Sequence, residues 1–340
     1  MKKIFVISLI IIIVAIIVIK FTSKKDNNIA VKEEKNITIR IAKQYGMQYS
    51  PVYVAEKLDL FKKHIPNANI EWYSFAGGAA MNEALIGGHL DIGFMGLPPA
   101  IIAIDKSAPL KIAMGISVPP SNLMVKNDKI KSIKDFKDTD KIAVPGIGSI
   151  QHITLSIAAK KILNNPNFFD NKLVAMANPD AYTALVSNTE ITAHMASMPY
   201  IEKEANAGFK NILSIKDALG DASIICVASE KFYSNSTAYA GVISAIQEAI
   251  SIINNKDAKV LDIVSEIEKI DRNNVESSLF WEGSKYTTSI YGLLELKNYM
   301  YETGYIKNNL NLNNLLYENA LTLIEKRSEK LSPTEIIHGK

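Results

Sequence analysis

Cysteine and arginine are scarce in this chain of 340 residues. Cys226 is the only cysteine, so the chain can form neither an intrachain disulfide nor a cysteine-based metal site. The only arginines are Arg40, Arg272 and Arg327, and the net charge of +3 comes almost wholly from lysine. Recognition of nucleic acid depends on arginine forks and clustered basic stripes, which this sequence lacks. We therefore expect no nucleic-acid partner.

Sequence signatures of enzymes and metal sites are also missing. The five histidines show no metal-ligand spacing, and no paired carboxylates stand out. The segment Gly146-Ile147-Gly148-Ser149-Ile150-Gln151 has two glycines of a dinucleotide fingerprint, but Gln151 stands where the third belongs. No Lys-Ser/Thr pair follows it to form a phosphate-binding loop. We expect no catalytic residue, no metal and no cofactor.

The overall composition is that of a globular protein with room for two domains. Hydrophobic residues make up 48% of the chain and charged residues 21%, so the chain is not disordered over most of its length. A chain of this length can supply each of two domains with its own core.

The N-terminus carries a hydrophobic segment that is expected to lie outside the fold. Lysines stand on both sides of an apolar run over residues 4–19, as in a signal peptide or a membrane anchor. The run is shorter than the about 20 residues that span a bilayer. No Ala-x-Ala cleavage site follows it, and the flanking lysines leave its orientation open. We favour an uncleaved anchor over residues 1–21, with a cleaved signal and an inside-facing segment as alternatives. Residues 22–36 are expected to form a tether, and residues 325–340 a loose tail.

One stretch of the chain recurs one hundred residues later, which indicates two lobes built on one plan. Residues 84–99 and 184–199 share an Ala-Leu pair, a methionine and a proline at matching positions without a gap. Upstream of each copy, a strand leads into a turn and a short helix. Strands and helices alternate from residue 37 to about residue 213, which predicts an α/β fold with mostly parallel sheets. Ligands of such sheets bind beyond the carboxyl ends of the strands.

Two chain crossings are expected to join the lobes. The first follows the break at Pro119-Pro120, and the second lies near Ala222, where a short apolar strand begins. Lobe 1 should then comprise residues 37–120 and 223–324, and lobe 2 residues 121–222. Two extended crossings make a hinge, because they can absorb the φ/ψ changes of domain closure.

A helix start after the predicted strand at residues 142–144 is a candidate binding group. Ser149 is a possible N-cap, and the free N–H groups behind it, with the positive end of the helix dipole, favour a polar or anionic ligand group. His152 would stay neutral there and could donate a hydrogen bond. The alternative is that Ser149 only caps the helix and that His152 lies on the surface. Gly77 and Gly78 could likewise let the backbone approach a ligand or simply form a turn.

Three further segments are open to two interpretations. Leu97-Pro98-Pro99 and Ser197-Met198-Pro199 end their predicted strands in proline, so they either contact a ligand or only lead into the next helix. Trp281 is one of two tryptophans and could form an aromatic wall of the crevice or pack in the core.

Several of these segments, taken in order, resemble the solute-binding proteins of ABC importers for alkanesulfonates, taurine, nitrate and thiamine-pyrimidine precursors. The resemblance covers roughly residues 37–323. It implies a type II periplasmic-binding fold, with two lobes joined by two crossings. The segments that carry it are Gln44-Tyr45-Gly46, Ala55-Glu56-Lys57-Leu58-Asp59-Leu60-Phe61, residues 84–93, Ile133-Lys134-Asp135-Phe136, residues 142–144 and Gly148-Ser149-x-x-His152.

The resemblance also implies the ligand contacts and the partners. It implies a monomer on the outer face of the cytoplasmic membrane, N-terminally anchored or secreted, that delivers a small-molecule ligand to ABC permease and ATPase subunits. The lipobox cysteine common in Gram-positive relatives is missing, which moves anchoring onto the apolar N-terminus. No arginine falls near the predicted crevice, so we expect no bidentate guanidinium clamp on a sulfonate. The ligand-contacting candidates, carried over by position, are Gln44, Tyr45, Gly77, Gly78, Leu97, Pro98, Ser149, His152, Asn178, Met198 and Trp281.

Two other functions are compatible with the same two-lobed fold. An enzyme of thiamine-pyrimidine biosynthesis would depend on a cysteine-rich motif, and this chain has only Cys226. A ligand-sensing domain would need a separate signalling partner. We therefore expect a solute-binding protein, rather than an enzyme, that closes around its ligand.

Overall fold

The computed structural model describes residues 36–187 and 189–325 of the chain. The expected membrane segment, nearly all of the expected tether and nearly all of the expected tail lie outside the described residues. The folded unit begins at Ile37. Among the described residues, one helix, α11 (Ser236–Asn254), is long and apolar enough to cross a membrane. Half of that span is buried inside the protein, where it packs against the helices at residues 50–57 and 60–64, so we assign it to the core.

The first sheet has six strands in the order β11-β4-β10-β3-β1-β2. Strand β1 runs parallel to β2 and β3, whereas β10 runs antiparallel to β3 and β4, and β11 runs antiparallel to β4. The central strand β3 is an apolar run that is buried along its whole length. The strands are β1 (Ile37–Lys43), β2 (Ala68–Ser74), β3 (Ile92–Gly96), β4 (Leu110–Val118), β10 (Ile224–Ser229) and β11 (Lys285–Tyr286).

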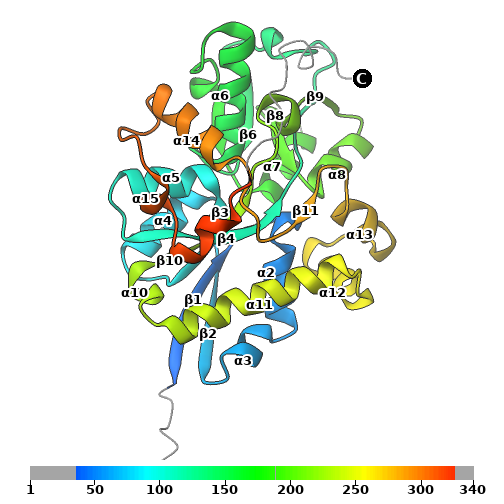
Figure 1. Ribbon diagram of the computed structural model, residues 1–340. Coiled ribbons are helices and arrows are strands. Elements are labelled where there is room, and N and C mark those ends of the chain that lie inside the picture. Colours follow the sequence, from blue (N-terminus) through cyan, green and yellow to red (C-terminus); the bar gives the residue numbers. More distant parts are fainter. Residues whose placement is uncertain (1–35, 188, 326–340) are drawn as a thin grey trace, which may run out of the picture. The chain divides into compact units, whose positions relative to one another are not determined.

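The second sheet has five strands in the order β7-β6-β8-β5-β9. Strand β6 runs parallel to β7 and β8, and β5 runs antiparallel to β8 and β9. In Figure 1, β6, β8 and β9 lie in the upper half of the view, and β1 and β2 lie in the lower half. The strands are β5 (Ser121–Val125), β6 (Lys141–Val144), β7 (Leu173–Ala175), β8 (Ile191–Ser197) and β9 (Lys210–Ser214).

The two sheets share one strand order, as the recurring segment predicts. The order β4-β10-β3-β1-β2 in the first sheet matches β9-β5-β8-β6-β7 in the second, with parallel and antiparallel pairs at the same places. The two copies of the recurring segment begin in α4 (Gly78–Ile86) and α7 (Asn178–Val186) and continue into β3 and β8. The predicted two-lobed α/β fold is confirmed. The sheets are mixed rather than mostly parallel, because the strand after each chain crossing, β5 or β10, runs antiparallel to both of its neighbours.

Helices precede, connect and follow the strands. Helices α2 (Ser50–Lys57) and α3 (Leu60–His64) are separate, because Asp59 has a left-handed backbone with φ of 52° between them. The remaining helices are α5 (Leu97–Asp105), α6 (Ile150–Leu163), α8 (Tyr200–Asn206), α9 (Ile215–Ala218), α10 (Glu230–Tyr233), α12 (Ala258–Glu268), α13 (Arg272–Leu279), α14 (Leu293–Glu302) and α15 (Leu312–Leu315), with 3-10 turns at Met47–Tyr49, Ile133–Asp135, Asp170–Lys172 and Glu318–Leu323.

The apolar core of the first sheet extends into the second. Ile150, Ile153 and Ile157, on α6, belong to the core cluster that contains β1, β3 and β4. Leu155, on the same helix, belongs to the separate cluster of the second sheet. Helix α6 therefore packs on both sides, and each buried isoleucine contributes roughly 1.5–3 kcal/mol.

Candidate functional site

The first turns of four helices meet at one cavity between the two sheets. Helices α4 and α5 follow β2 and β3, and helices α6 and α7 follow β6 and β7, so all four begin beyond the carboxyl ends of parallel strands. The cavity volume is about 20 Å³, which is room for about one water molecule. Its lining residues are Gln44, Tyr45, Gln48, Tyr49, Ala76, Gly78, Gly96, Pro99, Pro145, Ser149, Ile150, Gln151, Asn178 and Ile224.

The polarity of the cavity comes from helix ends and neutral side chains. Among the described residues that line it, none is Asp, Glu, Lys, Arg or His. The first N–H groups of a helix have no partner within the helix, and the dipole places about half a positive charge at that end. The first turns of α4, α5 and α6 hold no acidic side chain, and Asp180 in the first turn of α7 is exposed and does not line the cavity. Such helix N-termini suit an anion or the electronegative group of a polar molecule.

Ser149 caps α6, which confirms the predicted N-cap. Its Oγ accepts a hydrogen bond from the backbone N–H of His152 at 3.2 Å, and within the described part of the chain its hydroxyl donates to no other group. Nearby, Nε2 of Gln151 donates to Oγ of Ser197 at 3.3 Å, which ties the start of α6 to the end of β8. The second sheet therefore contributes two neutral polar side chains from one helix turn.

Two glutamines after β1 supply the polar groups of the first sheet. Nε2 of Gln44 donates to the carbonyl oxygen of Phe94 at 3.1 Å. Nε2 of Gln48 donates to the carbonyl oxygen of Tyr45 at 3.1 Å, but its Oε1 is buried with no hydrogen-bond partner among the described residues. An unpaired buried acceptor costs about 1–3 kcal/mol. A donor on a bound molecule would remove that cost.

Gly77 and Gly78 allow two close backbone approaches. A Cβ atom on Gly78 would lie 2.6 Å from a side-chain carbon of Pro99, at the start of α5. A Cβ atom on Gly77 would lie 2.4 Å from the carbonyl oxygen of Pro145, in the loop after β6 of the second sheet. Gly77 thus lets the two sheets meet at the rim of the cavity, and Gly78 lets α4 approach α5.

His152 is turned away from the cavity, which corrects both interpretations made from the sequence. The residue is 3% exposed, so it does not lie on the surface. Its Nδ1 accepts the backbone N–H of Gly148 at 2.9 Å, and its Nε2 lies 3.2 Å from Oδ1 of Asp170. The ring also packs edge-on against Tyr305. Burial lowers the pKa of His152, although Asp170 raises it in part. Both ring nitrogens are used within the protein, so His152 offers no hydrogen bond to the cavity.

The other predicted contacts divide into three groups. Gln44, Tyr45, Gly78, Ser149 and Asn178 line the cavity. Gly77 precedes α4 at the rim of the cavity. Leu97 and Pro98 are buried in the first turn of α5, and Pro99 of the same turn lines the cavity in their place. Met198 and Trp281 lie elsewhere: Met198 lines a small cavity beside Met47, and Trp281 lines a groove of about 590 Å³ near the crossing at Pro119 and Pro120. Gln48, Tyr49 and Gln151 also line the cavity and were not predicted from the sequence, although Gln151 follows the predicted N-cap by two residues.

A buried carboxyl group lies behind the loop that carries Gln44 and Gln48. Oε1 of Glu268, at the end of α12, accepts the backbone N–H of Gly46 at 3.1 Å. Burial raises the pKa of Glu268 to about 7, against the opposing effects of the Gly46 hydrogen bond and the charge of Lys203. Lys203 belongs to α8 of the second sheet, and its Nζ donates to the backbone carbonyl of Glu268 at 3.3 Å. Glu268 thus connects the loop of the first sheet to a helix of the second.

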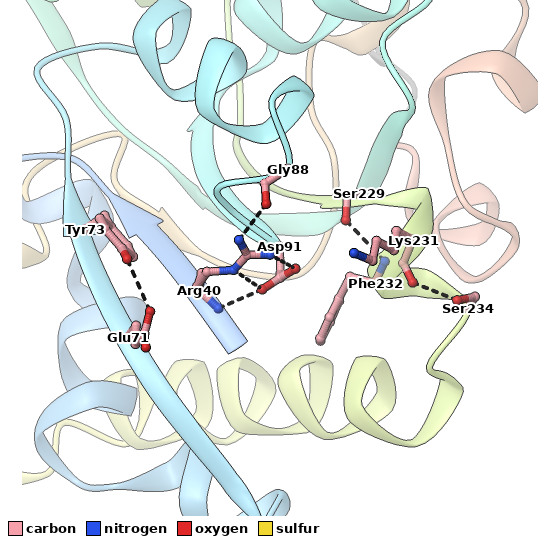
Figure 2. Close-up of polar contacts among 9 residues, drawn as sticks. All are labelled: Arg40, Glu71, Tyr73, Gly88, Asp91, Ser229, Lys231, Phe232 and Ser234. Carbon is pink, nitrogen blue, oxygen red and sulfur yellow. Dashed lines mark hydrogen bonds and ion pairs between the residues drawn. The ribbon is translucent and has the colours of Figure 1, made fainter. Parts of the chain in front are cut away.

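Arg40 has a structural partner far from the cavity lining. Its guanidinium donates to both oxygens of Asp91 at 3.0 and 2.9 Å and also contacts the carbonyl oxygen of Gly88 (Figure 2). Asp91 immediately precedes β3, whereas the cavity lies where β3 ends, at Gly96. This arginine therefore lies at the opposite end of the strand from the cavity.

A protein-family model and several solved structures are similar to this chain. A model of the NMT1-like family matches residues 32–261. None of the curated proteins compared with the chain matches it.

Solved structures with the same fold include three ligand-binding proteins. The alkanesulfonate-binding protein SsuA from Xanthomonas axonopodis pv. citri, bound to MOPS, is 17% identical over 83% of this chain and 99% of that chain, with a TM-score of 0.70. The periplasmic nitrate-binding protein NrtA from Synechocystis PCC 6803 is 12% identical over 85% and 88%, with a TM-score of 0.69. The ligand-binding component of an ABC-type import system from Staphylococcus aureus, with zinc bound, is 15% identical over 87% and 99%, with a TM-score of 0.67. The fold is that of the periplasmic binding proteins.

Proposed function

The chain belongs to the NMT1-like family, and from this membership and the geometry of the cavity we propose that it binds a small anionic or polar solute between its two sheets. The observation that carries the proposal is the convergence of the N-termini of α4, α5, α6 and α7 on one cavity without a charged side chain in its lining. Nitrate and an alkanesulfonate, named for two structurally similar proteins, are small anions of this kind.

Capture of the solute requires the two sheets to separate and close. A cavity of about 20 Å³ is too small for a molecule larger than water. The closed arrangement is held across the sheets by the hydrogen bond from the N–H of Met47 to the carbonyl oxygen of Met198, at 3.1 Å, and by the Gly77–Pro145 contact. The two sheets would open by rotation about the crossings between β4 and β5 and between α9 and β10. The solute would select the closed state.

The proposed partners are the permease and ATPase of an ABC importer, with the protein on the outer face of the cytoplasmic membrane. This assignment rests on the similarity to a ligand-binding component of an ABC-type import system and on the apolar N-terminus. We further propose that the protein is a monomer held by its N-terminus. A sensor would use the same cavity with a different partner, so co-purification of a permease distinguishes the two roles.

Cys226 gives no support to the enzyme alternative. It lies fully buried on β10, and burial raises the pKa of its thiol well above the usual range. A thiol in that state is not a nucleophile at neutral pH. Among the described residues, no group of three or more His, Cys, Asp and Glu side chains is arranged to hold a metal.

A thermal-shift panel combined with native mass spectrometry tests the proposal. Nitrate, sulfonates, pyrimidines and small amines are added to the purified protein, and any solute that co-purifies is identified after unfolding. A solute at about 100 times its dissociation constant stabilises the protein by about 2.7 kcal/mol, so the true ligand raises Tm clearly. The absence of both a co-purifying molecule and a thermal shift with every compound would reject solute binding at this cavity.

A further inference from the structure

A buried chain of polar side chains leads from the cavity lining into the second sheet. Figure 1 shows α7, β8 and α8, which pack side by side. His194 on β8 lies between Asn178, the first residue of α7, and Glu204 on α8. Its Nε2 is 3.1 Å from Oδ1 of Asn178, and its Nδ1 is 2.6 Å from Oε1 of Glu204. The side chains of His194 and Glu204 are 0% exposed.

The His194–Glu204 pair has to be electrically neutral as a unit. Among the ion pairs of the described residues, Glu204 has His194 as its partner, and Oε2 of Glu204 is buried without a hydrogen bond. An uncompensated charge in such surroundings costs several kcal/mol. Two neutral combinations exist: a carboxylate with an imidazolium, or a carboxylic acid with a neutral imidazole.

Both combinations place a proton on Nε2 of His194. In the charged pair, both ring nitrogens carry a proton. In the uncharged pair, the carboxylic acid of Glu204 donates to Nδ1, so the single imidazole proton is on Nε2. A bare Nε2 would require an Nδ1–H imidazole that donates to Oε1 of Glu204. Against a carboxylate, this buries a net negative charge. Against a carboxylic acid protonated on Oε2, it leaves a buried O–H without an acceptor, because Oε2 has no hydrogen-bond partner among the described residues. Nε2 therefore donates a hydrogen bond, and the atom of Asn178 that faces it has to be the carbonyl oxygen Oδ1.

We propose that His194 and Glu204 orient the amide of Asn178 so that it presents its NH₂ group, and not its oxygen, to the bound solute. The inference rests on the proposed function and deepens it, because it specifies an acceptor atom of the solute at this position. No hydrogen bond to Nδ2 of Asn178 exists among the described residues, and Asn178 lines the cavity. A lone asparagine side chain can turn its amide over and offer either atom. His194 and Glu204 are positioning residues that remove this choice.

The protonation of His194 can be measured without any ligand. Nitrogen-edited NMR spectra are recorded on protein labelled with ¹⁵N in its histidine rings, and the His194 signals are identified by their loss in His194→Gln. If that variant does not fold, nuclear Overhauser contacts between the His194 ring and the Asn178 amide identify them. We expect a proton on Nε2. A neutral ring with a bare Nε2 would overturn the inference and would leave the proposed function untouched.

The effect on binding is measured with nitrate and methanesulfonate as probes. Asn178→Asp keeps an acceptor for Nε2 but replaces the NH₂ group by an oxygen, so the affinity for both anions should fall at least about tenfold. In Glu204→Gln, the amide of the new side chain can donate to Nδ1 or accept from it, so the imidazole proton can lie on either nitrogen without a buried net charge. The amide of Asn178 can then occupy both orientations, and the affinity should fall about two- to fivefold. Glu190→Gln, in the exposed turn before β8, removes the same charge and should change nothing.

The binding results separate the inference from the proposed function. Unchanged affinity in Asn178→Asp, with an unchanged Tm that shows the variant is folded, would overturn the orientation of the amide. If the unsubstituted protein binds neither probe, the proposed class of ligand fails, and the NMR measurement still decides the state of His194.

Discussion

The backbone of Gly77 lies directly against the carbonyl oxygen of Pro145, and this contact joins the start of α4 to the loop after β6. A Cβ atom on Gly77 would be 2.4 Å from that oxygen. The φ of Gly77 is −155°, which any residue adopts, so the position requires glycine because of the contact and not because of the backbone conformation. The closed arrangement of the two sheets thus depends on a missing side chain.

Replacing this glycine should therefore weaken solute binding. Gly77→Ala keeps the sheets apart at the cavity, and we expect the affinity for the ligand found by the thermal-shift panel to fall by about tenfold, equivalent to about 1.4 kcal/mol. Titration calorimetry measures the loss. Gly146→Ala, in the neighbouring loop, is the matched control, because a Cβ atom there meets nothing within 4 Å. Equal affinities of the two variants would show that closure does not use the Gly77 contact.

His152 should affect stability and not affinity. His152→Leu leaves the buried N–H of Gly148 without the acceptor Nδ1, which should lower the free energy of unfolding of the ligand-free protein by about 1–3 kcal/mol. His152→Asn restores an acceptor near the same place and should recover part of the loss. Denaturant unfolding gives the stabilities, and calorimetry gives the affinity, which should change less than about twofold. A loss of affinity without a loss of stability would restore His152 as a ligand contact.

Glu268 should make the folded protein less stable as the pH rises. Its pKa is raised from 4.5 to about 7, so between these values the folded state binds more protons than the unfolded state. The stability contributed by the protonated form is complete below about pH 4.5 and is lost as the pH rises through about 7, in total about 3 kcal/mol.

The variant Glu268→Gln should remove this pH dependence. The amide oxygen can still accept the N–H of Gly46, but it does not ionise. Unfolding free energies measured from about pH 5 to about pH 8 should decline less steeply in Glu268→Gln than in the unsubstituted protein. Glu266→Gln, at an exposed carboxylate on the same helix that pairs with Lys57, is the control and should leave the slope unchanged. Parallel slopes for all three proteins would contradict the raised pKa of Glu268.

Removal of the N-terminal segment should leave the fold intact. The unit that begins at Ile37 is compact by itself. A chain that begins at Lys35 is expected to be folded and monomeric, with the same Tm as the longer chain. Gel filtration and circular dichroism check this expectation. Aggregation of the shortened chain would show that the first residues cover part of the apolar surface.

The sequence predicted the helix starts better than the side-chain contacts. A strand, a turn and a capping residue are local features, so the sequence predicts Ser149 as an N-cap. The repeat at residues 84–99 and 184–199 predicts two lobes built on one plan, and the structure adds the strand order that they share. Whether a first-turn side chain faces the cavity depends on distant residues. His152 turns toward Asp170 and Tyr305, and nothing near it in the sequence indicates that these residues lie beside it.

The hydrogen bonds among Asn178, His194 and Glu204 could not be predicted from the sequence, because they too join residues that are distant along the chain. Asn178 was selected by resemblance alone. Its buried partner His194 is 16 residues away and Glu204 is a further 10, and they meet only because α7 and α8 pack on β8. Gln48 and Gln151 were missed because each looks like an ordinary polar residue until the opposite sheet encloses it.

Small-angle X-ray scattering with and without solute tests the central claim, that the two sheets close on a small molecule. The solute is the one identified by the thermal-shift panel, and the unliganded protein is prepared by unfolding, removal of any bound molecule and refolding. The account predicts a smaller radius of gyration at saturating solute than in its absence, with Gly77→Ala showing a smaller difference. Identical radii for the unsubstituted protein in the two states would contradict capture by closure.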